Sequence, residues 1–164
     1  MKDDFFQVPI TEFSTSEGVV KLPILYYDVS QLMAFFWVEP GQDRSVVGDT
    51  AFEPVTFTNG KCVAGVVMYA YYHTTVGVYN EVGVAIAVRK KGQWMPFPET
   101  QLLLPASSRS LAFYVIDLPV TTQQARAAGR EIWGYPKFVT DIPLDFEGEH
   151  FKGAVMDPVR KKAF

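Results

Sequence analysis

Several residue types that common functional classes need are scarce in this sequence. It has one cysteine, Cys62, and two histidines, His73 and His150. A single cysteine excludes an intrachain disulfide, and so few ligands give a zinc site no obvious donor set. The phosphate-binding patterns GxGxxG and GxxxxGK(S/T) and the nucleophile pattern GxSxG are also missing. We therefore expect no bound metal and no cofactor, which leaves amine or carboxylate chemistry.

Positive charge and long apolar runs are scarce as well. The net charge is −3, and apart from short triplets at 89–91 and 160–162 the lysines and arginines are scattered. Because no basic surface is expected, nucleic acid is a poor partner. The N-terminus has aspartates where a signal peptide is basic, and no run of about 18 apolar residues is present. With Cys62 in an apolar segment, we expect a cytoplasmic protein that has no membrane partner.

Apolar and aromatic residues are abundant. The chain has 164 residues, of which 48% are hydrophobic and 15% aromatic. A chain of this size buries roughly 70% of its unfolded surface, which is enough for one substantial core. With no linker and no internal repeat, we expect a single domain over 1–164. Gly and Pro separate short runs rich in Val, Tyr, Phe and Ile, a pattern typical of strands. The expected fold class is α+β, mainly antiparallel β.

The pattern also places individual elements. Strands are expected at 19–27, 62–72, 79–89, 102–104 and 111–118, followed by a β-hairpin with arms at 138–146 and 150–156. The run 62–72 is apolar at nearly every position, which predicts a central strand covered on both faces. Helices are expected at 31–37, capped by Ser30, and at 123–128. For the second helix, Thr121 and Gln124 have capping-box spacing, and Gly129 is the expected stop.

The two faces of the segment 79–89 differ. One face carries four branched apolar residues and the other a carboxylate beside three small residues: Val82, Val84, Ile86 and Val88 against Glu81, Gly83, Ala85 and Ala87. The small side chains favour either a cavity wall, with the Glu81 carboxylate facing the cavity, or tight packing against another backbone. Alternation alone leaves both alternatives open.

Lys137 is the polar residue with the most unusual neighbours. It follows Tyr135 and Pro136 and precedes Phe138, in an apolar and aromatic stretch. Burial disfavours the ammonium form, and the free amine is the form that attacks a carbonyl. On local sequence alone, the commoner outcome is a lysine whose stem packs on an aromatic ring while its charge stays in water.

The remaining polar candidates are expected to be structural. His73 ends an apolar strand, where a hydrogen-bonded histidine is commoner than a catalytic one. His150 falls in the predicted hairpin and is expected at the surface. Asp117 and Asp141 are expected to be loop or hairpin residues rather than an acid pair.

Two motifs link Lys137 to Glu81. Gly129-Arg130-Glu131 followed by Tyr135-Pro136-Lys137 resembles the signature of the acetoacetate decarboxylase family, and Tyr79-Asn80-Glu81-Val82-Gly83 resembles its Y-x-E-x-G motif. Both stand in the family's order, and the resemblance spans about 22–156. It implies a barrel-like or cone-like β fold with a few short helices, complete or incomplete. It also implies a homo-oligomer that acts on a small keto acid.

The resemblance further implies roles for two catalytic residues. In the family, the lysine that matches Lys137 forms a Schiff base with a β-keto acid, and the protonated imine accepts the electrons released as carbon dioxide departs. Acetoacetate decarboxylase is itself a standard example of an activated lysine, so this mechanism comes from the family. The glutamate that matches Glu81 lies in the active-site cavity, where it would position substrate or water or shuttle a proton.

The sequence departs from the family's pattern in three ways. Phe138 stands where the decarboxylase has a second lysine. No arginine near Val19 and Val20 matches the one that suits a substrate carboxylate, and Lys21 is the available stand-in. The chain is also shorter than most members, as a truncated member, a fragment or half of an assembly would be.

Three functions stay open at this point. The first is a carboxy-lyase that decarboxylates a β-keto acid such as acetoacetate through Lys137. The second keeps the imine but uses it for an aldol, retro-aldol or dehydration step on another oxo acid. The third is a non-catalytic small-molecule binding protein on the same fold.

Overall fold

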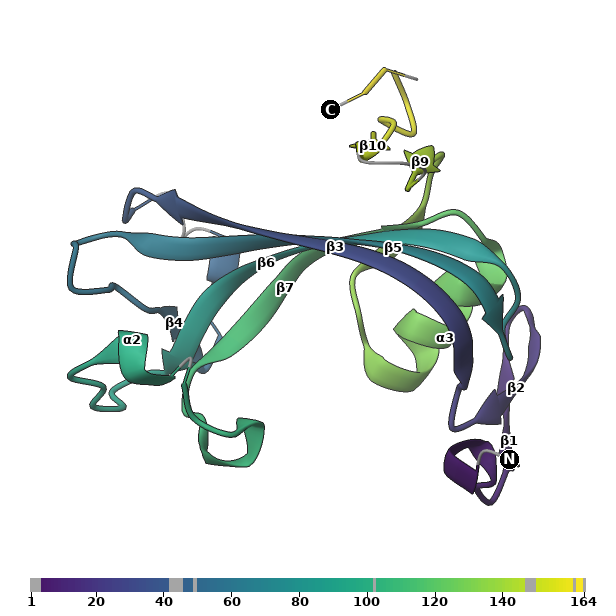
Figure 1. Cartoon of the computed structure of the whole chain (residues 1–164), viewed down its shortest axis with the longest axis horizontal. Coiled ribbons are helices and arrows are strands. Elements are labelled where there is room, and N and C mark those ends of the chain that lie inside the picture. Colours follow the sequence, from purple (N-terminus) through teal and green to yellow (C-terminus); the bar gives the residue numbers. More distant parts are fainter. Residues whose placement is uncertain are drawn as a thin grey trace. The chain divides into compact units, whose positions relative to one another are not determined.

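A mixed β-sheet dominates the structure, which is a computed structural model that describes residues 4–41, 46–48, 50–101, 103–146, 150–160 and 162–163. The elements are η1 (Asp4–Phe6), β1 (Thr11–Thr15), β2 (Gly18–Leu22), β3 (Tyr26–Val38), β4 (Phe52–Pro54), β5 (Cys62–Thr74), β6 (Tyr79–Lys90), α2 (Pro98–Gln101), η2 (Ala106–Ser108), β7 (Ala112–Val120), α3 (Gln123–Trp133), β8 (Lys137–Val139), β9 (Leu144–Asp145) and β10 (Lys152–Gly153). The large sheet has six strands in the order β3-β5-β6-β7-β8, with β4 paired to β6 (Figure 1). Pairing is antiparallel at β1–β2, β4–β6 and β9–β10 and parallel at β7–β8. This sheet with few helices agrees with the expected class.

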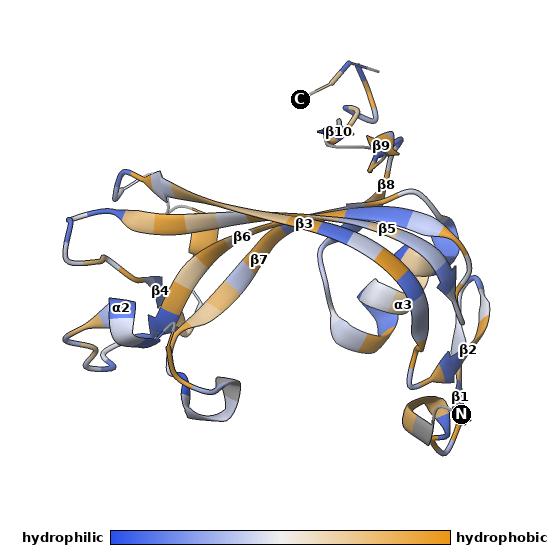
Figure 2. Ribbon diagram, viewed as in Figure 1, coloured by the Kyte–Doolittle hydropathy of each residue, from blue (hydrophilic) through white to orange (hydrophobic). Residues whose placement is uncertain are grey.

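The chain divides into two compact units, and the long strands contribute to both. Unit 1 is Met1–Leu32, Met68–Val82 and Leu118–Phe164, and unit 2 is Met33–Val67 and Gly83–Asp117. The core of unit 1 gathers buried residues from strands, a loop and helix α3: Val20, Tyr71, Val76, Tyr79, Val120, Ala125 and Ala128. Unit 2 has two smaller core clusters, and Figure 2 shows hydrophobic residues along its strands β4 and β6. That the whole chain is one domain stays a prediction.

The prediction of a helix at 31–37 is wrong, because these residues belong to β3. This strand lies at the edge of the large sheet and pairs with β5. A short apolar run fits a helix or a strand equally well by periodicity, and the aromatic run Phe35-Phe36-Trp37 has the higher propensity for a strand. More than half of each of these three side chains is exposed. The pairing with β5, which no local pattern contains, therefore decides the structure of this segment.

The strands expected at 62–72 and 79–89 are confirmed as β5 and β6. Strand β5 lies between β3 and β6, so its central position is confirmed too. Its cover is only partial, because most residues between Val63 and Tyr69 are half-buried. Cys62 is buried, as expected. In β6 residues of both faces are buried, including Glu81, Val82 and Ala87.

Helix α3 is longer than expected and passes through Gly129, the predicted stop. Its N-cap is Thr122 rather than Thr121, and the Thr122 hydroxyl accepts a hydrogen bond from the backbone N–H of Ala125 at 3.3 Å. The helix ends at Gly134, whose φ of 70° is the left-handed conformation that favours glycine. The glycine at 129 therefore has a reason other than helix termination.

The C-terminal hairpin is confirmed only in part. Residues expected to begin its first arm form β8, which pairs in parallel with β7 in the large sheet. The short strands β9 and β10 pair antiparallel, and the expected turn at 147–149 lies outside the described residues. The strand at 102–104 is wrong: Leu103 and Leu104 lie in a turn, and Leu102 is outside the described residues. None of the described helices is long and apolar enough to cross a membrane.

Candidate active site

Lys137 and Glu81 form a buried ion pair within unit 1. The Lys137 Nζ lies 2.5 Å from the Glu81 Oε2, although the two residues are 56 positions apart in the sequence. Their side chains keep only 9% and 10% exposure, so the amine is not held in bulk water. Lys137 therefore differs from the commoner case of a lysine whose stem packs on an aromatic ring while its charge stays in water. It brings together the two residues that the sequence motifs singled out.

The position of each partner follows from the sheet. Glu81 is the third residue of β6, on the same face as Tyr79. Lys137 is the first residue of β8 and is the register partner of Leu118 in β7. Strand β7 lies between β6 and β8, so the two side chains meet across it.

The backbone around Lys137 is held by the end of helix α3. The N–H of Tyr135 donates to the carbonyl of Gly129 at 3.0 Å, and the Arg130 Nη1 donates to the carbonyl of Lys137 at 3.1 Å. The Lys137 stem then runs directly over Gly129. A Cβ added at Gly129 would overlap the Lys137 Cδ and lie 2.5 Å from its Cε.

Glu131, the next residue of the motif, makes a different contact. Its carboxylate accepts hydrogen bonds from the Ser16 N–H at 2.9 Å and from the Ser16 hydroxyl at 2.5 Å, and so joins α3 to the turn between β1 and β2. These bonds stabilise the charged carboxylate and lower the pKa of Glu131 below its ordinary value. Glu131 therefore ties the helix to the hairpin and does not face Lys137.

A cluster of four tyrosines adjoins the ion pair through Tyr79, and the sequence analysis missed them as a group. The ring of Tyr71 lies 4.9 Å from Tyr26, 5.2 Å from Tyr69 and 4.5 Å from Tyr79. The hydroxyls of Tyr26 and Tyr79 are 3.4 Å apart, and the Lys137 Nζ lies 5.8 Å from the Tyr79 ring. Alternation within β6 could have placed the Tyr79 ring on the face of Glu81, and alternation within β5 could have placed Tyr69 and Tyr71 on one common face.

Burial sets the charge state of this tyrosine cluster. Loss of water, followed by the negative charge of Glu81, raises the pKa of Tyr69, Tyr71 and Tyr79 above the ordinary value. The phenols are therefore neutral at neutral pH, and Tyr26, whose pKa burial also raises, is neutral too. The ion pair is thus bordered by aromatic rings and neutral hydroxyl groups.

Other candidates from the sequence lie elsewhere. Lys21 is exposed and follows the buried Val20 in β2, so its side chain points to the opposite face from the core. His73 is exposed with its ring 4.6 Å from Tyr27, and His150, Asp117 and Asp141 are exposed as well. Among the described residues no group of three or more metal-binding side chains occurs.

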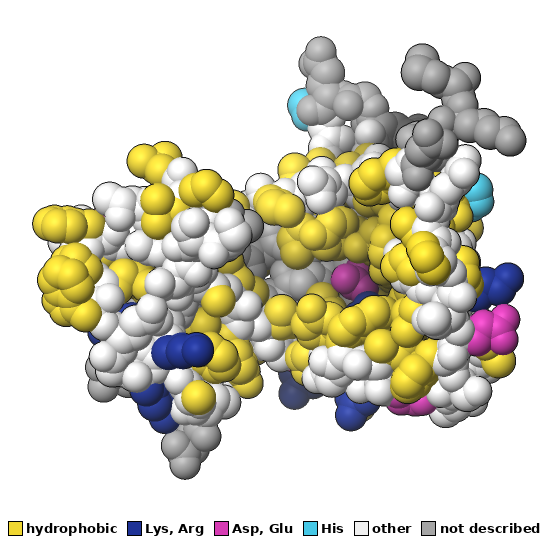
Figure 3. Space-filling model, turned by 90° about the horizontal axis from the view of Figure 1, so that it is seen from below, with side chains coloured by type: hydrophobic (Ala, Val, Ile, Leu, Met, Phe, Trp, Pro, Cys, Tyr) yellow, Lys and Arg dark blue, Asp and Glu magenta, His cyan; other side chains and the backbone are white. Residues whose placement is uncertain are grey.

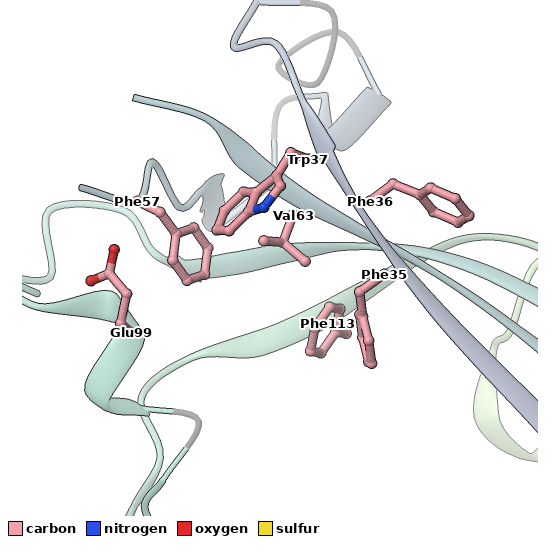
Figure 4. Close-up of a pocket in the computed structure, with 7 residues that line it drawn as sticks. All are labelled: Phe35, Phe36, Trp37, Phe57, Val63, Glu99 and Phe113. Carbon is pink, nitrogen blue, oxygen red and sulfur yellow. The ribbon is translucent and has the colours of Figure 1, made fainter. Parts of the chain in front are cut away.

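Unit 2 contains a separate apolar pocket of about 310 Å³. Its lining is aromatic and aliphatic apart from one carboxylate: Phe35, Phe36, Trp37, Phe57, Val63, Phe113 and Glu99 (Figure 4). The Glu99 carboxylate accepts bonds from the Thr58 hydroxyl at 2.6 Å and the Thr58 N–H at 2.8 Å, which lower the pKa of Glu99. Both of these bonds go to the Glu99 Oε1, so Thr58 fixes the one carboxylate among the residues that line this pocket.

Comparison with protein families decides the identity of the chain. The family model for acetoacetate decarboxylase matches residues 7–161. The chain belongs to the acetoacetate decarboxylase family. Lys137 and Glu81 both lie within the matched range. No curated protein matches the sequence.

Solved structures of acetoacetate decarboxylase family proteins share this fold. An acetoacetate decarboxylase from Legionella pneumophila is 18% identical with a TM-score of 0.61, and the match covers 94% of this chain and 52% of that one. A second acetoacetate decarboxylase is 19% identical with a TM-score of 0.65, covering 86% of this chain and 48% of that one. This chain therefore spans about half the length of these solved structures.

A third similar structure is a biosynthetic enzyme. It is the enduracididine biosynthesis enzyme MppR, solved with the condensation product of pyruvate and imidazole 4-carboxaldehyde. Its identity is 13% and its TM-score 0.53, over 82% of this chain and 51% of MppR. At these identities the likeness concerns the fold alone.

Proposed function

We propose that this acetoacetate decarboxylase family chain forms a Schiff base at Lys137 with a small keto acid and decarboxylates a β-keto acid such as acetoacetate. The observation that carries the proposal is the ion pair between the Lys137 Nζ and the Glu81 Oε2, 2.5 Å apart and largely out of water. A Schiff-base lysine needs an amine in a dry site and a nearby base. The pair supplies both: an amine largely out of water and a carboxylate within hydrogen-bond distance of it.

Glu81 is the group that would prepare the amine. An ammonium has no lone pair, so Lys137 must first transfer a proton to an acceptor within hydrogen-bond distance. Glu81 is at that distance. The free amine then attacks the carbonyl carbon, the C–N bond forms, and the carbonyl oxygen leaves as water after accepting two protons. One of these protons is the one that Glu81 holds, and the other comes from the attacking nitrogen, which keeps one hydrogen in the iminium.

The decarboxylation step follows from the charge of the imine. When the iminium nitrogen is positive, the bond between the α-carbon and the carboxylate breaks, and its electron pair moves toward nitrogen. Carbon dioxide leaves, and an enamine remains. Protonation of the α-carbon and addition of water then return the free lysine and release a ketone. The neutral tyrosine rings near Glu81 would lower the polarity around the carboxylate that is lost.

A second reaction uses the same imine differently. Phe138 stands in place of a second lysine, and Lys21 is exposed on the face of β2 that points away from the core, so neither position puts a second ammonium beside the Lys137 amine. An aldol or dehydration step on another oxo acid needs the iminium but no leaving carboxylate. The fold likeness to MppR, solved with a condensation product of pyruvate, favours keeping this alternative. A non-catalytic binding protein is the third proposal, and it would leave Lys137 without a covalent reaction.

Architecture and assembly are further proposals. We propose that the large sheet belongs to the barrel-like or cone-like fold of the family. The 13-residue edge strand β3, with its exposed apolar side chains, supports assembly into a homo-oligomer. The cytoplasm is the proposed compartment, on the basis of a single buried cysteine.

Borohydride trapping tests the Schiff base. The protein is incubated with acetoacetate, a longer β-keto acid and pyruvate, then reduced, and the modified peptide is found by mass. We expect an adduct on Lys137, none in Lys137→Ala, and trapping slower by about 10²-fold or more in Glu81→Gln, which loses the base. Release of carbon dioxide from the β-keto acids distinguishes decarboxylation from the aldol or dehydration alternative.

A surface lysine provides the matched control. Lys61 is paired with Glu39 in an exposed ion pair, so Lys61→Ala removes a lysine that has a carboxylate partner in water. This variant should be trapped like the wild type. A folded wild-type protein with no adduct from any of the three acids would rule out both imine reactions and leave the binding protein.

A further inference from the structure

The motif Gly129-Arg130-Glu131 stands on the last turns of α3, and its first two residues contact Lys137. Gly129 leaves the space that the Lys137 stem fills, and Arg130 donates to the Lys137 carbonyl at 3.1 Å. Neither residue reaches the atoms that would react. Both determine where the Lys137 amine is held.

We propose that Gly129 and Arg130 are positioning residues for Lys137: the glycine provides a track for its stem, and the arginine fixes its backbone. The catalytic consequence rests on the proposed function, whereas the steric coupling between Gly129 and Lys137 does not. Together they place the Nζ at the Glu81 carboxylate. A displaced stem would separate the amine from its base.

Gly129 lowers the stability of helix α3, and its positioning role explains why a glycine is present there. Glycine inside a helix is about 1 kcal/mol less favourable than alanine, and Gly129 lies in the interior of α3, four residues before its end. Such a glycine usually has a packing reason. Here the reason is visible: a Cβ would overlap the Lys137 Cδ and lie 3.1 Å from the Cγ. The overlapped atoms belong to a flexible side chain, so the lysine would move while the helix stays formed.

Arg130 fixes the backbone of Lys137, whereas Gly129 makes room for its side chain. The N–H of Lys137 donates to the Tyr135 carbonyl at 2.8 Å, and the Lys137 carbonyl accepts from Arg130. The peptide groups on both sides of the Lys137 Cα are therefore engaged. Arginine suits this task because its guanidinium is planar and always charged, so it presents donors in a fixed direction.

A double-mutant cycle tests the steric part without any substrate. In Gly129→Ala, we expect Tm to fall, because the Lys137 stem must leave its track. In a Lys137→Ala background the same change should raise Tm or leave it unchanged, because the space is then empty and alanine favours the helix. An equal change of Tm in both backgrounds would overturn the steric coupling.

Trapping tests the functional part. A misplacement of about 1 Å can cost roughly 10²-fold in rate, so Gly129→Ala should be trapped that much more slowly while its circular dichroism spectrum is unchanged. Arg130→Met should also be trapped more slowly than wild type, with part of the rate restored in Arg130→Lys. Arg126→Met is the control, since Arg126 is on the same helix but bonds to Gln123 and pairs with Glu17 rather than with Lys137.

The two failures are distinguishable. If no oxo acid is trapped in the wild type, the proposed function fails and the Tm cycle alone decides whether Gly129 positions Lys137. If the wild type is trapped and Gly129→Ala reacts equally fast, the positioning role of the glycine is wrong. Equal rates for Arg130→Met and Arg126→Met would remove the arginine from the proposal.

Discussion

At the residue scale, the tyrosines around Glu81 make the site unusual. Tyr71 and Tyr79 are almost fully buried in the core of unit 1, and each ring contacts another tyrosine ring. A phenol in such a place resists ionisation, because burial and the charge of Glu81 both disfavour the phenolate. The ion pair therefore keeps neutral neighbours over a wide range of pH.

This arrangement predicts how stability depends on alkaline pH. The unfolded chain releases tyrosine protons above about pH 10, whereas folded Tyr71 keeps its proton, because its pKa is raised by burial. The stabilisation is complete below the unfolded pKa, so the free energy of unfolding should fall as pH rises above it. Urea unfolding between pH 8 and about 11 measures this decline.

Tyr71→Phe removes the ionisable group and keeps the ring, so its decline with pH should be shallower than that of the wild type. Tyr72→Phe, which alters an exposed ring on the next residue, is the control and should follow the wild type. Identical pH dependence in all three proteins would contradict the prediction.

The residues of the candidate site were partly predictable. Lys137 and Glu81 could be named because each lies in a short motif that resembles the family. Their contact could not be derived, because β7 lies between their strands and they are 56 residues apart. Tyr26 is the first residue of β3, but most of that strand was predicted as a helix. The position of Tyr26 beside Tyr79 therefore could not be predicted. Contacts across a sheet depend on strand order, which local patterns do not contain.

At the element scale, the Glu131 carboxylate provides the shortest polar contacts between the β1–β2 hairpin and α3, beside a longer ion pair of Arg126 with Glu17 at 3.9 Å. Glu131 receives both donors of Ser16, and its pKa is lowered by them. A depressed pKa means that the folded state favours the charged form. The contribution to stability is complete above the unfolded pKa and is lost as pH falls through the lower, folded pKa.

We therefore expect Glu131→Gln to lower Tm at neutral pH, and we expect the difference in Tm from the wild type to become smaller as the pH is lowered. Thermal unfolding of wild type and variant from pH 7 down to about pH 3 measures the difference, which should shrink below the ordinary glutamate value of about 4.3. Ser16→Ala should reproduce the loss at pH 7. A difference in Tm that is constant over this range would show that the Glu131 charge is not involved.

The elements differ in how far the sequence determines them. Strands β5 and β6 are long, apolar and bounded by turns, so both were predicted within a few residues. The start of helix α3 was predicted correctly, although its N-cap is Thr122 and not Thr121. Its length was not predicted, because Gly129 was taken as a stop, whereas this glycine leaves space for the Lys137 stem. For β3, the aromatic run was compatible with either a helix or a strand, and the pairing with β5 makes it a strand.

At the scale of the whole molecule, exposed apolar surface is the feature that needs an explanation. On the face drawn in Figure 3, hydrophobic side chains are widespread. The strand β3 exposes Met33 by 52% and Phe36 by 53%, and as the outermost strand of the sheet in the described part of the chain it offers an edge to another strand. The solved relatives are about twice as long as the matched part of this chain. A sheet edge of this kind should associate with further protein.

The last prediction follows from that edge. The chain should form a homo-oligomer, and Met33→Lys with Phe36→Lys should weaken it, because charges on an edge strand oppose pairing. Sedimentation velocity over a range of concentrations measures the association. Trp94→Lys, which changes a side chain that is 84% exposed outside the strands, is the matched control and should associate like the wild type. Trapping at Lys137 should persist in all these variants if unit 1 alone holds the site, whereas loss of trapping together with association would mean that the assembled form is needed for the reaction.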